Sequence, residues 1–321
     1  MTNRGEDRAI GSKDQDAPGV WLIAGPTASG KSHLALDLAR RFNGEIINAD
    51  SIQLYRDFEI LTARPGPQDL ASVPHHLYGT VDGREAWSVG RWLRETAMRL
   101  DEIATRGRRA IIVGGTGLYF LALTRGLSDA PSAPLEVRER AKAQLTEEGE
   151  ARFRQGLAEV DPEAAARILP GDRQRLTRAW EVYLHTGKPL TAWWGEAKPV
   201  LADPPALVLD PPRDALYARC DARLHAMVAQ GVLAEIEAWQ ARGLSPDAPV
   251  SKAVGLRELA EAVEGRVSLS DALGLAAQAT RRYAKRQATW FRHQAPSWPR
   301  LTCLDPDEQR AEAMAILMRT G

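Results

Sequence analysis

Short apolar runs alternate with longer amphipathic stretches along the first third of the chain. The apolar runs predict buried strands at Val20–Ala24, Glu45–Ala49, His76–Val81 and Ala110–Val113. The stretches Lys31–Phe42 and Ser88–Arg106 carry apolar residues at helical spacing, and Ser88 is placed to cap the second helix. Because strands that alternate with helices pair in parallel, the pattern predicts an α/β fold in which helices wrap a parallel sheet.

The pattern is helical throughout between residues 129 and 197. It predicts helices at Leu135–Glu148, Ala151–Val160, Pro162–Leu169 and Arg173–His185. A strand candidate, Ala206–Leu209, returns only after this block. We therefore expect an all-helical subdomain over 129–197, inserted into a core formed by 19–128 and 198–321. Helices packed on the face of the sheet are the alternative.

The segment after residue 210 and the first 18 residues contain no further pattern typical of a strand. Helices are predicted at Arg213–Gln230, Val232–Arg242, Lys252–Glu264 and Leu269–His293. Residues 1–18 carry seven charges and no apolar segment, so we expect a disordered tail and neither a signal peptide nor an anchor. No apolar run approaches the ~18 residues that a membrane span needs. We expect a cytoplasmic monomer with no membrane partner.

Composition narrows the class of protein without naming a partner. The 321 residues are 44% hydrophobic, and 42 basic residues balance 42 acidic ones. Bulk charge therefore gives no sign of a nucleic acid, although local patches decide such binding. Cys220 and Cys303 lie far apart without ligand-like neighbours, which favours a reducing compartment over a disulfide framework or a zinc site.

The first predicted strand leads into a segment that fits the phosphate-loop pattern G-x-x-x-x-G-K-[ST], and a predicted helix follows it. Glycines let successive backbone N–H groups turn toward an anion, and the helix adds the positive end of its dipole. Lys31 supplies a cation for the outer phosphates, and the Ser32 hydroxyl is suited to ligate Mg²⁺. The phosphate-binding set is Gly25, Pro26, Thr27, Ala28, Ser29, Gly30, Lys31 and Ser32.

Two other predicted strands are followed by polar residues that are candidates for catalysis. Nucleotide hydrolases normally add an apolar strand that ends in Asp, whereas Ala110–Val113 leads into Gly-Gly and Thr116. Asp50 follows the strand Glu45–Ala49. The carboxyl ends of parallel strands open onto one crevice, so Asp50 and Thr116 should both face the bound phosphates. Spacing leaves open whether Asp50 is a Mg²⁺ partner, as in kinases, or a general base.

Two basic clusters favour a long polyanion as ligand, because a free nucleotide needs neither. In the last predicted helix, Tyr283, Trp290 and Phe291 interleave with the basic residues Arg281, Arg282, Lys285, Arg286 and Arg292. The helical block contributes Arg138, Arg140, Arg173, Arg175 and Arg178. The alternative is that both clusters are ordinary solvated helix faces.

Seven motifs in order, spread from Gly19 to Leu304, resemble the tRNA dimethylallyltransferases, also called tRNA isopentenyltransferases. They are Gly25–Ser32, Ala49–Ser51 with Gln53 and Tyr55, Thr62–Pro65, Pro74–Leu77, Val113–Tyr119, Asp172–Ala179, and Tyr283–Gln287 with Thr289–Arg292. The resemblance implies a P-loop fold with an insertion that grips the anticodon stem-loop of tRNA. It also implies transfer of a dimethylallyl group from dimethylallyl diphosphate to N6 of adenosine 37, in tRNAs that read codons starting with U.

The resemblance also implies roles for residues. The phosphate loop would hold the donor diphosphate instead of ATP, with Mg²⁺ on the diphosphate. Asp50 would take the N6 proton as general base, Lys31 would stabilise the leaving group, Thr116 would lie at the substrate and Arg257 would clamp the diphosphate. The flipped adenosine and the rest of the tRNA would contact Asp50, Ser51, Ile52, Gln53, Thr116, Arg138, Gln174, Arg175, Leu176, Thr177, Arg178, Lys252, Ala253, Val254, Gly255, Leu256, Arg257, Lys285, Arg286, Gln287, Ala288, Thr289, Trp290, Phe291 and Arg292.

Several alternatives stay open on the residues alone. A prenyltransferase acting on free AMP or ADP shares the chemistry, and a P-loop kinase for a small metabolite or a non-enzymatic RNA-binding module shares the motif or the basic clusters. His75 and His76 resemble a metal pair, although a structural role at the strand entry is favoured. Tyr119 and Phe120 either wall the prenyl pocket or pack in the core.

Overall fold

The computed structural model describes residues 19–318 except 129 and 196, and it divides into two compact units. One unit contains the described residues up to Thr124 and from Leu201 onward, and the other runs from Arg125 to Val200. The helical subdomain expected over 129–197 falls inside this second unit. The tail expected over 1–18 lies outside the described residues. No helix in the described part of the chain is long and apolar enough to cross a membrane.

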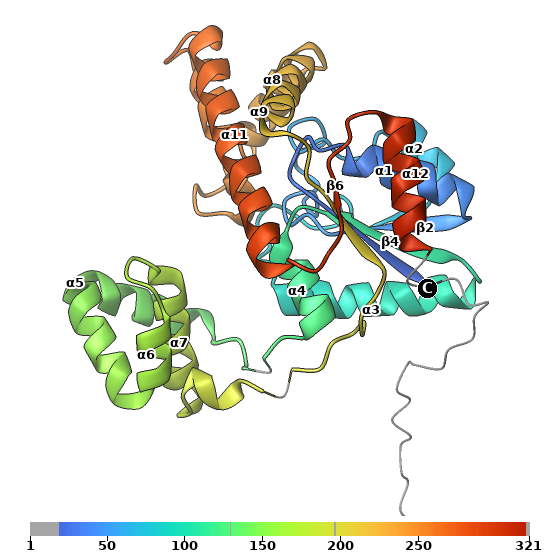
Figure 1. Ribbon diagram of the computed structural model, residues 1–321. Helices are drawn as coiled ribbons and strands as arrows, with labels where there is room; N and C mark the ends of the chain where they lie inside the picture. The colour runs from blue at the N-terminus through green and yellow to red at the C-terminus, as the bar shows by residue number, and fades with distance from the viewer. Residues whose placement is uncertain (1–18, 129, 196, 319–321) are drawn as a thin grey trace, which may run out of the picture. The chain divides into compact units, whose positions relative to one another are not determined.

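The first unit is built on a parallel six-stranded sheet with the order β3-β2-β4-β1-β5-β6 (Figure 1). Its strands are β1 Val20–Ala24, β2 Gly44–Asn48, β3 His75–His76, β4 Arg109–Gly114, β5 Ala206–Leu209 and β6 Arg300–Leu301. The predicted α/β fold with a helix-wrapped parallel sheet is therefore confirmed. The strand predicted over His76–Val81 is wrong beyond its first residue, because Leu77 turns to φ 63° and ends the extended run.

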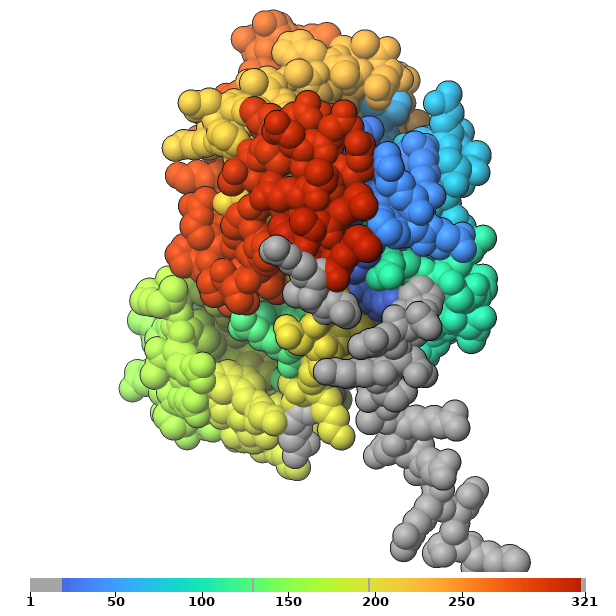
Figure 2. Space-filling model, turned by 45° about the vertical axis from the view of Figure 1, so that its right-hand side comes forward, coloured from blue at the N-terminus to red at the C-terminus, as the bar shows by residue number. Residues whose placement is uncertain are grey.

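Helices cover both faces of this sheet. The helices of this unit are α1 Lys31–Arg41, α2 Pro67–Ser72, α3 Val89–Thr105, α4 Gly117–Arg125, α8 Arg213–Ala229, α9 Val232–Ala241, α10 Leu256–Val263, α11 Leu269–Gln294 and α12 Pro306–Leu317, of which α1, α3 and α12 contact the strands most. On one face, α1 and α12 pack with alternate strand residues such as Ile23 and Ile111, and Figure 2 shows the two helices side by side at the surface. On the other, Trp92 of α3 stacks on Tyr119 of α4. Two-sided cover explains why the strands are continuously apolar.

The second unit has its own apolar core. It contains α5 Leu135–Val160, α6 Pro162–Arg167 and α7 Arg173–Thr186, whose core includes Phe153, Leu157 and Leu176. Gly149 breaks α5 with φ 77° and ψ 163°, in agreement with the two helices predicted on either side of it. Gly187 ends α7 in the left-handed region with φ 68°, as glycine after a helix commonly does.

One helix begins later than its pattern predicts. The prediction placed a helix at Lys252–Glu264, but α10 begins at Leu256, and Pro249–Lys252 forms a separate 3₁₀ turn. Gly255, with φ 87°, lies between the two. The apolar residues keep helical spacing on both sides of Gly255, but the backbone leaves the helix there. Its left-handed conformation is one that glycine adopts readily.

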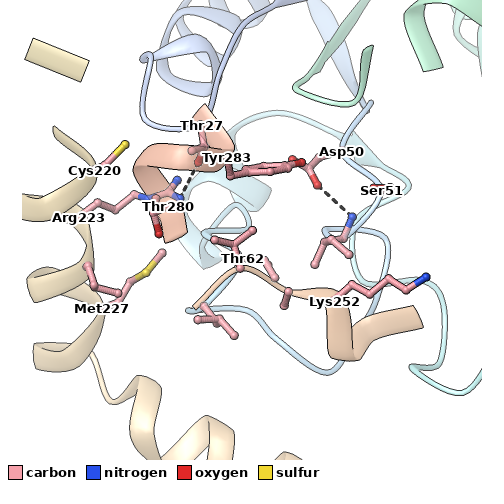
Figure 3. Close-up of a pocket in the computed structure, with 15 residues that line it drawn as sticks. Thr27, Asp50, Ser51, Thr62, Cys220, Arg223, Met227, Lys252, Thr280 and Tyr283 are labelled. Carbon is pink, nitrogen blue, oxygen red and sulfur yellow. Dashed lines mark hydrogen bonds between the residues drawn. The ribbon is translucent and has the colours of Figure 1, made fainter. Parts of the chain in front are cut away.

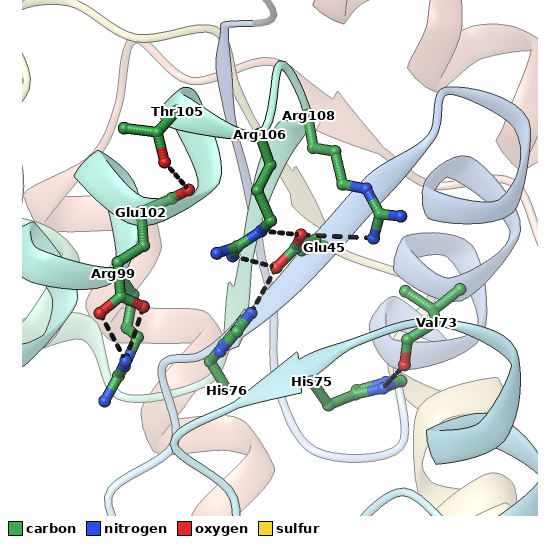
Figure 4. Close-up of polar contacts among 9 residues, drawn as sticks. All are labelled: Glu45, Val73, His75, His76, Arg99, Glu102, Thr105, Arg106 and Arg108. Carbon is green, nitrogen blue, oxygen red and sulfur yellow. Dashed lines mark hydrogen bonds and ion pairs between the residues drawn. The ribbon is translucent and has the colours of Figure 1, made fainter.

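A buried carboxylate on β2 ties the edge of the sheet together (Figure 4). Glu45 is 1% exposed and accepts two hydrogen bonds from Arg106 at 2.8 and 2.7 Å, one from Arg108 at 3.3 Å and a contact with His76 Nε2 at 2.6 Å. His75 Nδ1 contacts the Val73 carbonyl at 2.7 Å. The described residues contain no group of three side chains suited to a metal. Both histidines therefore make structural contacts at the edge of the sheet, as the favoured interpretation expects.

We expect Glu45→Gln to lower the free energy of unfolding by about 3 kcal/mol at neutral pH. Burial alone raises the pKa of Glu45, but the hydrogen bonds from Arg106 and His76 bring it down to about 2. A lowered pKa means that the stabilisation is present above the unfolded value and lost as the pH falls toward 2. Urea unfolding should therefore show wild type and variant converging between about pH 4.5 and pH 2.

Glu102→Gln is the matched control, since the side chain of Glu102 is 43% exposed and pairs with Arg99 three residues away on α3. Its effect should stay below about 0.5 kcal/mol. Equal losses in the two variants, or a Glu45→Gln loss that does not change with pH, would contradict the role assigned to Glu45.

Candidate active site

The phosphate-loop segment joins β1 to α1 with the geometry that its glycines permit. Gly30 starts the helix from the left-handed region, with φ 98°, and Lys31 folds back so that its ammonium donates to the Pro26 carbonyl at 3.1 Å. Gly25, Pro26 and Ser29 are buried within the loop. The other five members line a cavity of about 420 Å³, namely Thr27, Ala28, Gly30, Lys31 and Ser32.

Cations from two elements meet at this cavity. Arg219 and Arg223 reach it from α8, and the Arg223 guanidinium donates to the Thr27 hydroxyl at 2.7 Å. Burial lowers the pKa of the Lys31 ammonium to about 8, while Asp50 opposes this shift and Arg223 reinforces it. Buried cations that repel one another favour an anion between them, so the cavity is suited to a phosphate group.

Asp50 enters the same cavity from the end of β2. Its Oδ1 accepts the Ile52 N–H at 3.0 Å, which fixes the carboxylate orientation. Asn48, which is fully buried, accepts the Asp50 N–H at 2.8 Å and donates to the Asp50 and Leu77 carbonyls, both at 2.9 Å. The turn is thus held by its own polar groups, and the second carboxylate oxygen is left for a ligand.

Thr116 contacts the segment that carries Asp50. It lines neither the phosphate-loop cavity nor the apolar cavity beside it. Its hydroxyl accepts the Ser51 N–H at 2.9 Å, and its own N–H donates to the Ala49 carbonyl at 3.1 Å. Thr116 therefore supports the segment that carries Asp50, and its expected place at the substrate stays a prediction.

A second cavity of about 250 Å³ adjoins the first and shares Thr27, Asp50, Thr62 and Arg223 with it (Figure 3). Figure 3 shows Arg223 and Met227 of α8 on one side and Asp50 on the other. Much of its lining is apolar: Ile52, Leu61, Leu224, Met227, Ala253 and Val254. Tyr283 of α11 completes the wall, and burial raises the pKa of its phenol. One continuous site therefore combines a cationic end, a carboxylate and an apolar surface.

Arg257 was expected at the diphosphate, but the structure does not bring it there. It lies in the first turn of α10 and lines a separate groove together with Arg282 and Arg286 of α11. The late start of α10 is the reason, because Lys252–Val254 take the cavity wall and Arg257 follows one turn later on the outer side. Arg223 occupies the phosphate end instead.

Burial decides one open alternative for aromatic side chains and corrects three expected tRNA contacts. Tyr119 and Phe120 are core residues, 2% and 1% exposed, and neither lines the two cavities. Leu176, Leu256 and Phe291 are at most 2% exposed, so their side chains face the interior and cannot contact tRNA as placed here. Helical spacing decides this, since each lies on the apolar stripe of its helix.

The other expected tRNA contacts divide between the two units. Exposed in the first unit are Lys252, Lys285, Arg286, Thr289 and Arg292, while Ser51, Ile52, Gln53, Val254, Ala288 and Trp290 are half-buried and Ala253, Gly255 and Gln287 are buried. In the second unit, Arg138, Gln174 and Arg175 are exposed. Arg178 instead donates to the Ala130 and Pro131 carbonyls, both at 3.1 Å, and Thr177 is half-buried.

Sequence patterns missed two residues of the site. Arg223 lies within an ordinary helical pattern on α8, 196 residues from Thr27 of the loop that it contacts. Asn48 is the last residue of an apolar run, where its side chain replaces backbone partners. The available signal for Asn48 was a polar residue directly after Ile46 and Ile47 at the end of a buried strand, since buried amides are normally hydrogen-bonded.

Comparison with known proteins shows the family to which the chain belongs. The family model described as IPP transferase matches residues 53–294, and one described as Isopentenyl transferase matches residues 18–78. A tRNA dimethylallyltransferase of Phenylobacterium zucineum is 56% identical over 298 residues, covering 93% of this chain and 97% of the relative. One of a Caulobacter species is 57% identical, covering 89% and 94%.

Solved structures point the same way. A full-length tRNA isopentenylpyrophosphate transferase of Bacillus halodurans aligns with TM-score 0.66 and 33% identity, over 94% of this chain and 96% of that one. A eukaryotic dimethylallyltransferase acting on tRNA aligns with TM-score 0.78 and 30% identity, over 92% and 78%. On these matches, the chain belongs to the IPP transferase family, together with the tRNA dimethylallyltransferases.

Proposed function

We propose that the protein is a tRNA dimethylallyltransferase, which moves a dimethylallyl group from dimethylallyl diphosphate to N6 of adenosine 37 in tRNAs that read codons starting with U. The observation that carries the proposal is the continuous site in which Lys31, Arg223 and Asp50 line one cavity and an apolar cavity adjoins it at Asp50 and Arg223. The cationic end suits a diphosphate, the apolar part suits a five-carbon group, and the carboxylate suits an amine. A kinase that binds only a phosphate donor such as ATP would explain the cationic end, but neither the apolar part nor the carboxylate.

In this reaction the C–O bond to the diphosphate breaks and a bond from N6 to the same carbon forms. Negative charge grows on the leaving oxygens, beside the ammonium of Lys31 and the guanidinium of Arg223. Those interactions strengthen as the bond breaks, which is where stabilisation raises the rate. The adenine amine is a weak nucleophile, and Asp50 accepts the proton that it loses.

The residues present also fit Mg²⁺, which prefers few protein ligands together with phosphate oxygens and water. The Ser32 hydroxyl and the Asp50 carboxylate line the cavity that would hold the diphosphate, and the described residues offer no larger acidic cluster. When bound, the ion would neutralise charge on the diphosphate. Lys31 and Arg223 would still orient it.

The adenosine must leave its stack to reach a site of this kind, as bases do in other enzymes that modify them. Exposed basic residues of α11, including Lys285, Arg286 and Arg292, are suited to the phosphates of the anticodon stem-loop. In the helical unit, exposed Arg173 and Arg175 on α7 offer a second basic surface. Two such surfaces favour tRNA over AMP or ADP as the acceptor.

The direct test uses labelled dimethylallyl diphosphate with unmodified tRNA, beside AMP and ATP-hydrolysis controls, with and without Mg²⁺. Label in tRNA at an adenosine next to the anticodon supports the proposal. Label in AMP would move the protein to the free-nucleotide prenyltransferases, and ATP turnover without transfer would make it a kinase.

Replacing Asp50 by Asn should lower kcat roughly a thousandfold, because the amide cannot accept the N6 proton. Binding of tRNA should persist, since Asn keeps an oxygen for the Ile52 N–H. Single-turnover transfer and filter binding measure the two effects. Asp101→Asn is the control, at an exposed position on α3. Near-native turnover in Asp50→Asn would remove the base assignment.

Arg223→Gln should raise the KM for the donor by about tenfold to a hundredfold, because a charged hydrogen-bond donor to the diphosphate is lost. The KM for tRNA should change little. Arg213→Gln provides a control on the same helix, where the arginine is exposed and contacts only Tyr217 four residues away in the described structure. If the donor KM of Arg223→Gln equals that of the control, the diphosphate lies elsewhere.

Affinity for inorganic diphosphate should fall as the pH rises through 8, because the lowered pKa of Lys31 lets its ammonium lose a proton in that range. The protonated form binds the anion, so the sign is a weaker complex at higher pH. Lys31→Arg keeps its charge over this range and should lack the contribution of Lys31 to the pH dependence. Any pH dependence that remains in this variant reports ionisation of the diphosphate itself. Calorimetry between about pH 7 and 9 compares the two proteins. Parallel pH profiles would contradict the prediction.

A further inference from the structure

We propose that Gln287 is a positioning residue that ties the basic helix α11 to the phosphate loop. Its side chain is 6% exposed and makes two long-range hydrogen bonds. The Oε1 atom accepts the Thr27 N–H at 2.8 Å, and Nε2 donates to the Gly115 carbonyl at 2.9 Å. One amide thus joins the end of the chain to the loops after β1 and β4.

Only a carboxamide of this length satisfies both partners. The Thr27 N–H can only donate and the Gly115 carbonyl can only accept, so the two ends of the amide are fixed in their roles. Glutamate would accept from Thr27 and have nothing to donate to Gly115. Asparagine is one methylene too short to reach both from the same backbone position. A residue that merely filled space would not need this pairing.

The glycines after β4 are shaped to receive this helix. A Cβ built on Gly115 would lie 2.2 Å from Gln287 Nε2, and one on Gly117 would lie 2.1 Å from the Trp290 ring. Both approaches are far below ordinary van der Waals separation. The glycine-rich segment that follows β4 therefore lets the inner face of α11 pack closely against it. Gln287 and Trp290, three residues apart on the helix, make the two contacts.

The outer face of the same helix exposes Lys285 and Arg286. If these meet tRNA, as the proposed function on which this inference rests requires, then a shift of α11 on tRNA binding reaches the Thr27 amide through Gln287. Thr27 also receives the Arg223 guanidinium at the cationic end of the site. Gln287 thereby sets the loop conformation that binds the diphosphate, and coupling between the two ligands is reciprocal.

The experiment measures dissociation constants for inorganic diphosphate and for tRNA in the full-length protein, with Gln287→Ala, Gln287→Glu and the control Gln278→Ala. Gln278 is exposed on the same helix. We expect diphosphate affinity and donor KM to worsen about tenfold in both Gln287 variants, as loss of a partner for a buried polar group implies. The affinity of the ligand-free protein for tRNA should remain near wild type, and the control should change neither.

A double-mutant cycle with Gly115→Ala separates positioning from loss of stability. The added methyl would strike the Gln287 amide, so Gly115→Ala should weaken diphosphate binding strongly in the wild-type background and much less beside Gln287→Ala. Additive effects would overturn the inference, because residues that touch should couple. So would a Gln287→Ala protein that unfolds earlier but binds diphosphate like wild type.

Failure of this inference is distinguishable from failure of the proposed function. If the wild-type protein transfers dimethylallyl groups but its Gln287 variants keep native diphosphate affinity, only the role of Gln287 is contradicted. A wild type that binds diphosphate without any transfer to tRNA sinks the proposed function, and the cycle with Gly115 still decides whether Gln287 positions the loop.

Discussion

The site depends on a balance of charge at the carboxyl edge of the sheet. Lys31 and Arg223 are both half-buried cations whose pKa values are lowered by burial, and Asp50 is the carboxylate that offsets them. Repulsion between the cations is tolerable only with an anion nearby. A diphosphate placed there would complete the balance, and its departure as a leaving group would be stabilised by the same cations. The loops around this edge serve to keep the three groups in position.

Those loops are held by polar groups inside the chain itself. Asn48 bonds to both sides of the turn that presents Asp50, and Thr116 supports the next residue from the neighbouring strand. Gln287 does the same for the phosphate loop from the far end of the sequence. Rigid placement matters because a reacting group displaced by even 1 Å loses much of its effect.

Local signals made much of this fold predictable. The run Val20–Ala24 and the loop that follows it carry their own pattern, and Ser88 caps α3 as its position indicates, accepting the Arg91 N–H at 3.1 Å. Long-range packing was not predictable. The two-residue strand β6 is too short for any periodicity, and Arg223 becomes a site residue only because α8 lies beside the phosphate loop. Arg257, by contrast, is expected at the diphosphate from the family resemblance and lies outside the two cavities of the site.

The most direct measurement is a structure of the protein bound to inorganic diphosphate and an unmodified anticodon stem-loop. We expect the diphosphate between Lys31 and Arg223, and the flipped adenine with its N6 atom about 2.6–3.2 Å from the Asp50 carboxylate. A diphosphate bound away from Lys31, or an adenine that stays in its stack with its amine beyond reach of Asp50, would contradict this expectation.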